Sequence, residues 1–344
     1  MSTMRAVQWI GPDALEVTDT EMPTVPEGWS LVEVEYTGLC GTDFSILKGT
    51  HPRAAAPLIL GHEITGVVAH SNGDGLAEGT RVTVEPLIHC GHCHPCGHGN
   101  AHVCQNLGLY GIDRPGSMAE YVALPTAALV PVRSDVPATE VALAEPLAVA
   151  VHAVDRSGLR GGETVVVFGA GPIGILTALV ARQEKAAEVL IVEPSVERAH
   201  LARTLGFTVV DAADTVAGIR SATAGVGADI VFDSAGHPAV AAMVTAAARV
   251  HGTIVIVGVY KKPTAVDLQA INFLEHTVIG SRVYTRGDVE QAVRLIETDA
   301  LGLSRLPVQV FAMDQVTEAF DIAMSAGAIL KVLVSPTAGN EGRN

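Results

Sequence analysis

From residue 163 onward the chain repeats one pattern that constrains its fold more than any other feature. Short apolar runs rich in β-branched residues recur, and helix-like stretches rich in Ala, Leu, Arg and Glu lie between most of them. The runs are ETVVVFG, EVLIVEP, FTVVD, ADIVFDSAG, TIVIVGV and TVIGSRV. Strands that alternate with helices in this way build a parallel sheet buried on both faces. We therefore predict a doubly wound sheet of the kind that binds a dinucleotide.

A glycine-rich turn follows the first of these runs. The G-x-G-x-x-G pattern is weak evidence on its own, but here it directly follows a strand and opens an apolar helix. Backbone N–H groups at such a helix start can bind a pyrophosphate. The predicted cofactor-binding residues of this turn are Gly169, Gly171, Pro172, Ile173 and Gly174.

An acidic residue ends the next predicted strand. The carboxylate of Glu193 would accept hydrogen bonds from the adenine ribose and repel a 2′-phosphate, which favours NAD over NADP. Arg198 would stack on the adenine or, turned inward, tolerate a 2′-phosphate. The alternative is an ordinary strand-to-helix turn with a surface glutamate.

The first half of the chain has a different rhythm. Short strand-like runs such as WSLVEVEYTGLC, EITGVVAH and MAEYVALP alternate with Gly, Pro, Asn and Asp, as in an antiparallel barrel. Residues 287–301 read as an amphipathic helix, and the tail adds a helix and a strand. We expect a mostly-β catalytic domain over 1–153, a dinucleotide domain over 154–290, and a return to the first domain over 291–344.

Composition excludes several classes of partner. The chain has 344 residues, 48% of them hydrophobic, and a formal charge of −15, so nucleic acid and anionic membranes would be repelled. We find neither a signal-peptide pattern at the start nor an uninterrupted apolar run long enough to span a membrane. The sequence favours a cytoplasmic protein.

Four of the five cysteines lie close together. Cys90, Cys93, Cys96 and Cys104 form a C-x2-C-x2-C-x7-C run in the lobe 89–105, and this spacing is typical of a tetrahedral Zn²⁺ site. Four thiolates fill every coordination position, which predicts a structural site rather than a catalytic one. An iron–sulfur cluster or a ligand set that includes histidine is the alternative. We expect the interleaved histidines to be exposed loop residues: His89, His92, His94, His98 and His102.

A second metal site is predicted from less conspicuous residues. Cys40 in GLCGTD and the pair His62 and Glu63 in LGHEITG supply a thiolate, an imidazole and a carboxylate. Three protein ligands that leave a position open are the pattern of a catalytic zinc. Glu145 lies in an otherwise apolar segment, where an unpaired charge is costly, so it would face the metal directly or through water. Each residue alone has an ordinary structural explanation.

Taken together, these motifs resemble the zinc-dependent medium-chain alcohol dehydrogenase family. The resemblance rests on GLCGTD, GHEITGVV, the four-cysteine lobe, GSMAEYVALP, EPLAVAVHA and GAGPIG, in the family's order. It implies a GroES-like catalytic domain, a Rossmann domain, two zinc ions per chain and NAD. It also implies that Cys40, His62 and Glu63 hold the catalytic zinc, with Glu145 as the alternative or water-mediated ligand.

The resemblance also suggests a reaction. Thr42 would carry the substrate's proton away, and Asp43 would orient His62. EPLAVAVHA, with its glutamate, is similar to the polyol, butanediol and threonine dehydrogenase branch, and TVIGSRVYTRGDVEQAV is more similar to the butanediol-type members than to the ethanol-type ones. Many relatives have a histidine five residues after the cysteine ligand, where this chain has Ser45, so the proton route is open. The nearby His51 has a different offset, so the resemblance does not assign the relay role to it.

We therefore expect oxidation of a secondary hydroxyl in a small polyol or vicinal diol. The alternatives are L-threonine 3-dehydrogenase activity, a zinc-free quinone or enoyl reductase, and a non-catalytic NAD-binding zinc protein. A homodimer or homotetramer is expected, with edge-to-edge pairing of the strands around 277–283.

Overall fold

The computed structural model describes residues 2–325 and 327–337, and the chain forms two compact units. The first takes in the described residues of 1–145, 285–325 and 331–344, and the second those of 146–284 and 326–330. The expected boundaries at 153 and 290 are therefore too late. Helix α4 (Ala144–Ser157) runs through the first junction. Helix α11 (Arg286–Glu297) belongs to the first unit, where Arg286 donates hydrogen bonds to the carbonyls of Ala127 and Leu129.

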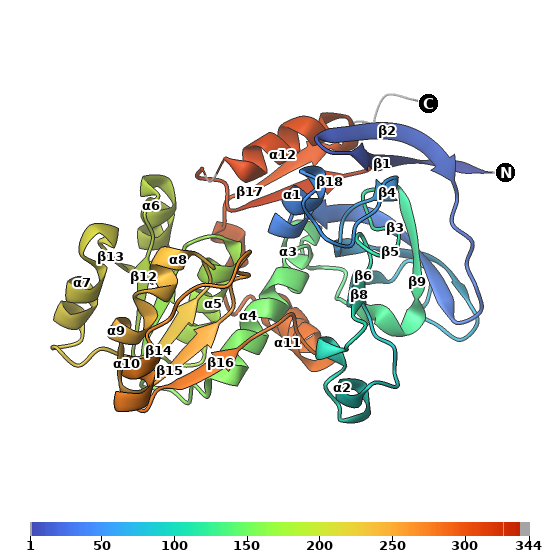
Figure 1. The fold of residues 1–344 in the computed structure, drawn as a ribbon. Helices are drawn as coiled ribbons and strands as arrows, with labels where there is room; N and C mark the ends of the chain where they lie inside the picture. The colour runs from blue at the N-terminus through green and yellow to red at the C-terminus, as the bar shows by residue number, and fades with distance from the viewer. Residues whose placement is uncertain (1, 326, 338–344) are drawn as a thin grey trace. The chain divides into compact units, whose positions relative to one another are not determined.

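Antiparallel sheet dominates the first unit, several of whose strands are labelled in Figure 1. Its larger sheet has the order β10-β6-β5-β3-β18-β17, and β9 also pairs with β3. These strands are β3 (Trp29–Gly38), β5 (Glu63–Asn72), β6 (Arg81–Val84), β9 (Tyr121–Pro125), β10 (Leu129–Pro131), β17 (Val308–Ala312) and β18 (Lys331–Ser335). Alternate residues such as Val32, Val34, Ile64 and Val82 form its core.

Smaller elements complete this unit. A second sheet joins β1 (Thr3–Gly11), β2 (Ala14–Glu21) and β4 (Leu58–Ile59), and a ribbon pairs β7 (Leu87–Ile88) with β8 (Gly108–Leu109). The helices are α1 (Gly41–Leu47), α2 (His94–Gly97), α3 (Ala138–Val141), α11 and α12 (Val316–Met324). Strand β18 pairs antiparallel with β3, so the C-terminal part of the chain lies in the sheet that carries β5.

The second unit contains the predicted parallel sheet, with the order β13-β12-β11-β14-β15-β16. The six apolar runs account for β11 (Thr164–Phe168), β12 (Glu188–Val192), β13 (Thr208–Val210), β14 (Ala228–Asp233), β15 (Ala248–Ile256) and β16 (Thr277–Gly280). Between them lie α5 (Pro172–Gln183), α6 (Val196–Thr204), α7 (Thr215–Ala222), α8 (Pro238–Ala241), α9 (Val244–Ala247) and α10 (Leu268–Phe273). This order reverses direction between β11 and β14, and doubly wound folds bind ligands at such a reversal.

None of the helices within residues 2–325 and 327–337 combines the length and apolarity needed to span a bilayer.

Candidate metal and dinucleotide sites

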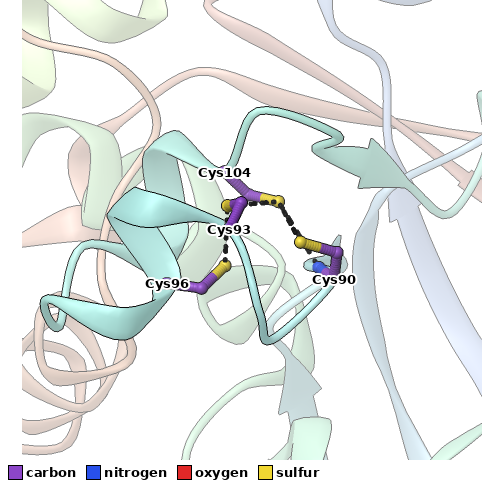
Figure 2. Close-up of side chains that lie close together, drawn as sticks. All are labelled: Cys90, Cys93, Cys96 and Cys104. Carbon is purple, nitrogen blue, oxygen red and sulfur yellow. Dashed lines mark hydrogen bonds between the residues drawn. The ribbon is translucent and has the colours of Figure 1, made fainter.

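The four cysteines of the lobe gather in one place (Figure 2). Cys93 Sγ lies 3.4 Å from Cys96 Sγ and 3.7 Å from Cys104 Sγ, and Cys104 Sγ lies 3.5 Å from Cys90 Sγ. A tetrahedron of thiolates about 2.3 Å from a central zinc has edges of about 3.8 Å, close to these separations. A disulfide needs about 2.05 Å between its sulfur atoms, so these thiols are not bridged.

Backbone amides in the lobe donate hydrogen bonds to cysteine sulfur atoms, which favours the thiolate form. Amide N–H groups of Cys90 and Asn106 donate to Cys104 Sγ over 3.4 and 3.3 Å. A hydrogen bond from the backbone of His92 is the largest cause that lowers the pKa of Cys90, to about 6. The thiolate is the form that binds a metal. The donor set and its spacing therefore fit zinc, whereas burial raises the pKa of Cys96 to about 12.

One expectation for the interleaved histidines is wrong. His89, His92, His94 and His98 are exposed, as expected, but the side chain of His102 is buried. It lies in the short helical turn 101–103, directly before the buried Cys104. Because the chain must turn inward to place the Cys104 sulfur, it carries His102 with it.

The second cluster draws its residues from two segments. Cys40 is the N-cap residue of α1, whereas His62 precedes β5 and Glu63 begins it. Strand β3 pairs Gly38 with Glu63 and so brings the segments together. One ligand atom from each of Cys40, His62 and Glu63 lies within 4.8 Å of the others. A Cβ at Gly38 would collide with the Glu63 carboxylate, so this close approach requires glycine.

Asp43 lies close to residues of both segments. Its Oδ2 accepts a hydrogen bond from the Cys40 amide over 2.9 Å, and its Oδ1 lies 3.8 Å from His62 Nδ1. Both Asp43 and His62 are buried. Burial lowers the pKa of His62, but Asp43, Cys40 and Glu145 together raise it well above its ordinary value. A cation is therefore favoured among these groups.

A lysine that sequence reasoning missed contacts the cluster. The Nζ of Lys331 on β18 forms an ion pair with Glu63 Oε2 and donates to the Leu39 carbonyl over 2.9 Å. Burial raises the pKa of Glu63 to about 7, although Lys331 opposes this shift. A lysine inside the apolar strand of AILKVLVSP was the available signal, because such a buried charge needs a partner.

Two further predicted residues lie close to the cluster. Glu145 is buried in the first turn of α4 and is near enough to raise the pKa of both His62 and Glu63. It is not part of the group whose ligand atoms lie within 4.8 Å of one another. Thr42 Oγ1 lies 3.8 Å from Cys40 Sγ, so its hydroxyl is beside the predicted ligand.

This donor set fits a zinc ion that has an open position. Thiolate, imidazole and carboxylate are all zinc ligands, and three of them leave one tetrahedral position for a substrate or water. Within the described residues, buried Nδ1 of His62 and buried Oδ1 of Asp43 have no hydrogen-bond partner. Metal coordination through the other ring nitrogen and orientation by a carboxylate would use these atoms.

In the second unit, the glycine turn joins β11 to α5. Gly169 has a positive φ of 97°, and a Cβ at Gly174 would collide with the Gly169 carbonyl. Gly171 is the N-cap residue of α5, which begins with Pro172 and Ile173. The amides at this helix start are therefore available to a pyrophosphate.

Glu193 and Arg198 lie beside this turn. Glu193 Oε2 accepts from the Ala170 amide over 2.7 Å and its Oε1 accepts from the Ser195 amide over 2.8 Å. Each carboxylate oxygen keeps a further lone pair for a ribose hydroxyl. A Cβ on Gly171 would lie 3.8 Å from Arg198 Nη1, which places the guanidinium next to the turn.

Two family models match the chain. Residues 26–134 match the alcohol dehydrogenase GroES-like domain, and residues 172–298 match the zinc-binding dehydrogenase domain.

Curated relatives and solved structures span nearly the whole chain. A 2-dehydro-3-deoxy-L-galactonate 5-dehydrogenase of Pseudoalteromonas atlantica is 36% identical, over 92% of this chain and 94% of the relative. An erythritol/L-threitol dehydrogenase of Mycolicibacterium smegmatis is 30% identical, over 97% and 98%. The crystal structure of a putative zinc-binding dehydrogenase from Sinorhizobium meliloti, bound to NADP, has a TM-score of 0.91 and 32% identity, and the match covers 98% of this chain and all of that one.

Proposed function

Because the chain belongs to the zinc-dependent medium-chain alcohol dehydrogenase family, we propose that it interconverts a secondary hydroxyl of a small polyol or vicinal diol and the corresponding ketone. The family consists of zinc-containing, NAD-dependent alcohol or polyol dehydrogenases. The observation that carries this proposal is the group formed by Cys40, His62 and Glu63, which leaves a coordination position open. The names of the sugar-acid and tetritol relatives support a polyhydroxylated substrate.

Each residue of the cluster has a part in this proposal. Cys40 and His62 would hold the zinc with a carboxylate from Glu63, or from Glu145 directly or through water. Bound there, zinc supplies Lewis acidity that lowers the pKa of a hydroxyl. Asp43, whose Oδ1 lies 3.8 Å from His62 Nδ1, would orient the ring of His62, and Lys331 would neutralise one oxygen of Glu63. The Thr42 hydroxyl would accept the substrate's proton.

The onward proton route leaves from Thr42. Ser45 does not fit the next position, because its Oγ donates back to the Gly41 carbonyl over 3.3 Å. His51 is a better candidate. Its Nδ1 accepts from the amides of Arg53 and Ala54, which leaves Nε2 as the nitrogen that carries or releases a proton.

For the cofactor, the amides of the turn from Gly169 to Gly174 would bind the pyrophosphate, and Glu193 the adenine ribose. NAD supplies the hydride acceptor, while the protein orients it. Arg198 would stack on adenine, and its position beside Gly171 is the reason to test NADP as well. The cysteines 90, 93, 96 and 104 would hold a second, structural zinc.

We also propose that the chain forms a homodimer through the edge of the parallel sheet. Strand β16 is the edge strand there, and Val278 on it is 47% exposed. Leu268 and Phe273 lie on α10, the helix that precedes β16 in the chain, and each is 73% exposed. Pairing two β16 edges would satisfy their backbone groups and cover these side chains. Light scattering should give a dimer mass or a multiple of it, and Val278→Lys should give monomers; a monomeric wild-type chain would contradict the proposal.

The function is tested by NAD⁺ reduction with zinc-loaded protein and a panel of substrates: 2,3-butanediol, sorbitol, a tetritol, threonine and a primary alcohol. The proposal predicts fast turnover on a diol or polyol. Turnover on threonine alone would instead establish the threonine dehydrogenase alternative. Tight NADH binding without turnover on any alcohol would overturn the enzymatic proposal.

A further inference from the structure

The residues proposed so far for NAD account for one half of the dinucleotide. The glycine turn after β11 would bind the pyrophosphate, and Glu193 after β12 the adenine ribose. The order of the parallel sheet reverses between β11 and β14, and a dinucleotide bound to a doubly wound sheet extends across such a reversal. The nicotinamide half is therefore expected at the loops that follow β14 and β15.

The loop after β14 adjoins the glycine turn directly. The Ser234 amide donates to the Phe168 carbonyl over 3.0 Å, and a Cβ at Gly169 would lie 3.5 Å from the Cβ of Ala235. Asp233, the last residue of β14, is buried, and its Oδ1 accepts from the Ala235 amide over 3.0 Å. Hydrogen bonds thus fix this loop beside the residues that would bind the pyrophosphate.

The loop after β15 is bound to the same aspartate. The amides of Val257 and Gly258 donate to the Asp233 carbonyl over 3.0 and 2.8 Å, and a Cβ at Gly258 would collide with the Gly236 nitrogen. The Tyr260 hydroxyl donates to Asp233 Oδ2 over 2.5 Å. Main chain and side chain of one buried residue therefore join the two loops at the carboxyl edge of the sheet.

Beyond Gly258, the segment 259–266 has few other attachments. It makes no backbone hydrogen bond with any residue that the structure describes. Several of its residues line an apolar hollow of about 450 Å³ together with Ile254 and Ile256 of β15, and a hollow supplies few packing contacts. Val259 is 86% exposed. The segment therefore relies on the next residue, Tyr260, for its connection to the edge of the sheet.

The Tyr260 hydroxyl is suited to act as a permanent donor. Burial raises the pKa of Tyr260, and so does the carboxylate of Asp233, which keeps the hydroxyl protonated. The same hydroxyl lies 3.3 Å from the His237 carbonyl, which belongs to the loop after β14 as well. A hydrogen bond to an ionised carboxylate is stronger than one between neutral groups, and its loss would leave one oxygen of a buried charge without this donor.

We propose that Tyr260 is a positioning residue for NAD, because its hydrogen bond to Asp233 holds the loop after β15 in the conformation that receives the nicotinamide half of the cofactor. Tyr260 would act through Asp233 and would not touch the cofactor. This inference rests on the proposed cofactor site and extends it from the adenine half to the nicotinamide half.

The test compares two ligands of the zinc-loaded full chain, NADH and ADP. ADP has the adenosine and the pyrophosphate but lacks the nicotinamide half. Tyr260→Phe removes only the hydroxyl, and we expect it to raise the Kd of NADH, measured by fluorescence titration, roughly tenfold, as for the loss of a charge-assisted hydrogen bond. The Kd of ADP, measured by calorimetry, should be unchanged. The matched control is Tyr121→Phe, which removes the hydroxyl of a half-buried tyrosine on β9 and should change neither value.

Asp233→Asn tests the hydrogen bond from its other end. Asparagine keeps an oxygen for the amides of the loop but offers no charge to the Tyr260 hydroxyl, so NADH should bind more weakly by a similar factor. If Tyr260 acts through Asp233, the double variant Tyr260→Phe/Asp233→Asn should bind NADH no more weakly than Tyr260→Phe alone. An additive loss would show that Tyr260 acts by another route and would overturn the inference.

The comparison of ligands separates positioning from a general effect on the fold. Equal weakening of NADH and ADP would indicate a general loss of structure in the second unit, and no change in either Kd would show that the hydrogen bond is dispensable. Both outcomes would overturn the inference and leave the proposed function intact, because binding is measured without turnover. A wild-type chain that binds neither ligand would overturn the inference together with the proposed cofactor site.

Discussion

The two clusters of metal-binding residue types differ in how the chain assembles them. The four cysteines of the lobe all lie between positions 90 and 104 of the sequence. Their sulfur atoms lie within 4.8 Å of one another. The cluster of Cys40, His62 and Glu63 depends on pairing between β3 and β5, and its charge balance depends on Lys331 at the other end of the chain. The four-cysteine cluster, which is evident from the sequence alone, is thus suited to stabilise the loop that contains it. The cluster assembled by tertiary structure keeps the open position that chemistry needs.

Cys40→Ser should have the largest effect. Loss of the thiolate removes a ligand of the proposed catalytic zinc, and kcat/KM for the best alcohol should fall by roughly 10³-fold or more. NADH binding, measured by fluorescence titration, should be unchanged because the cofactor residues lie in the second unit. Loss of both activity and NADH binding would show that Cys40 is structural. The two clusters would then no longer differ in having a catalytic role and a structural role, respectively.

Cys96→Ser should affect stability rather than chemistry. With one ligand gone, the lobe loses its zinc, and the free energy of unfolding should fall by about 4 kcal/mol or more, as is typical when a structural metal is lost. The correctly folded fraction, purified by size exclusion, should retain turnover per active site. Unchanged thermal stability would mean that the lobe does not hold a structural zinc.

Lys331→Met tests whether the second cluster depends on the distant strand. The substitution leaves Glu63 buried without its ionic partner, and the free energy of unfolding should fall by about 3 kcal/mol. The double variant Lys331→Met/Glu63→Gln should recover part of this loss, because no charge then remains unpaired. An additive loss in the double variant would show that the two side chains do not interact.

Much of this arrangement can be predicted from sequence. Apolar runs placed all six parallel strands, and the cysteine spacing identified the lobe. Strand β17 and the pair β1 and β2 were not predicted, because VQVFA and the N-terminal residues carry polar side chains at half-exposed positions that obscure the alternation. Lys331 was missed for a different reason: a lysine in an apolar strand signals that it needs a partner, but no local pattern identifies Glu63, which lies far away in the sequence, as that partner.

Glu193→Ala should have the smallest effect, and it leaves both clusters intact. Loss of the carboxylate should raise KM for NAD⁺ roughly tenfold and change KM for NADP⁺ little, because ribose hydrogen bonds are lost while repulsion of the 2′-phosphate disappears. Glu197→Ala, which removes a neighbouring exposed carboxylate, is the control. An unchanged ratio of the two KM values would show that Glu193 only anchors the glycine turn through the Ala170 amide.

The most direct test of the difference between the clusters is zinc content measured together with turnover in the wild type, Cys40→Ser and Cys96→Ser. The account predicts two zinc ions per wild-type chain and one in each variant, with activity kept by Cys96→Ser and lost by Cys40→Ser. One zinc per wild-type chain, or activity that follows the zinc of the cysteine lobe, would contradict it.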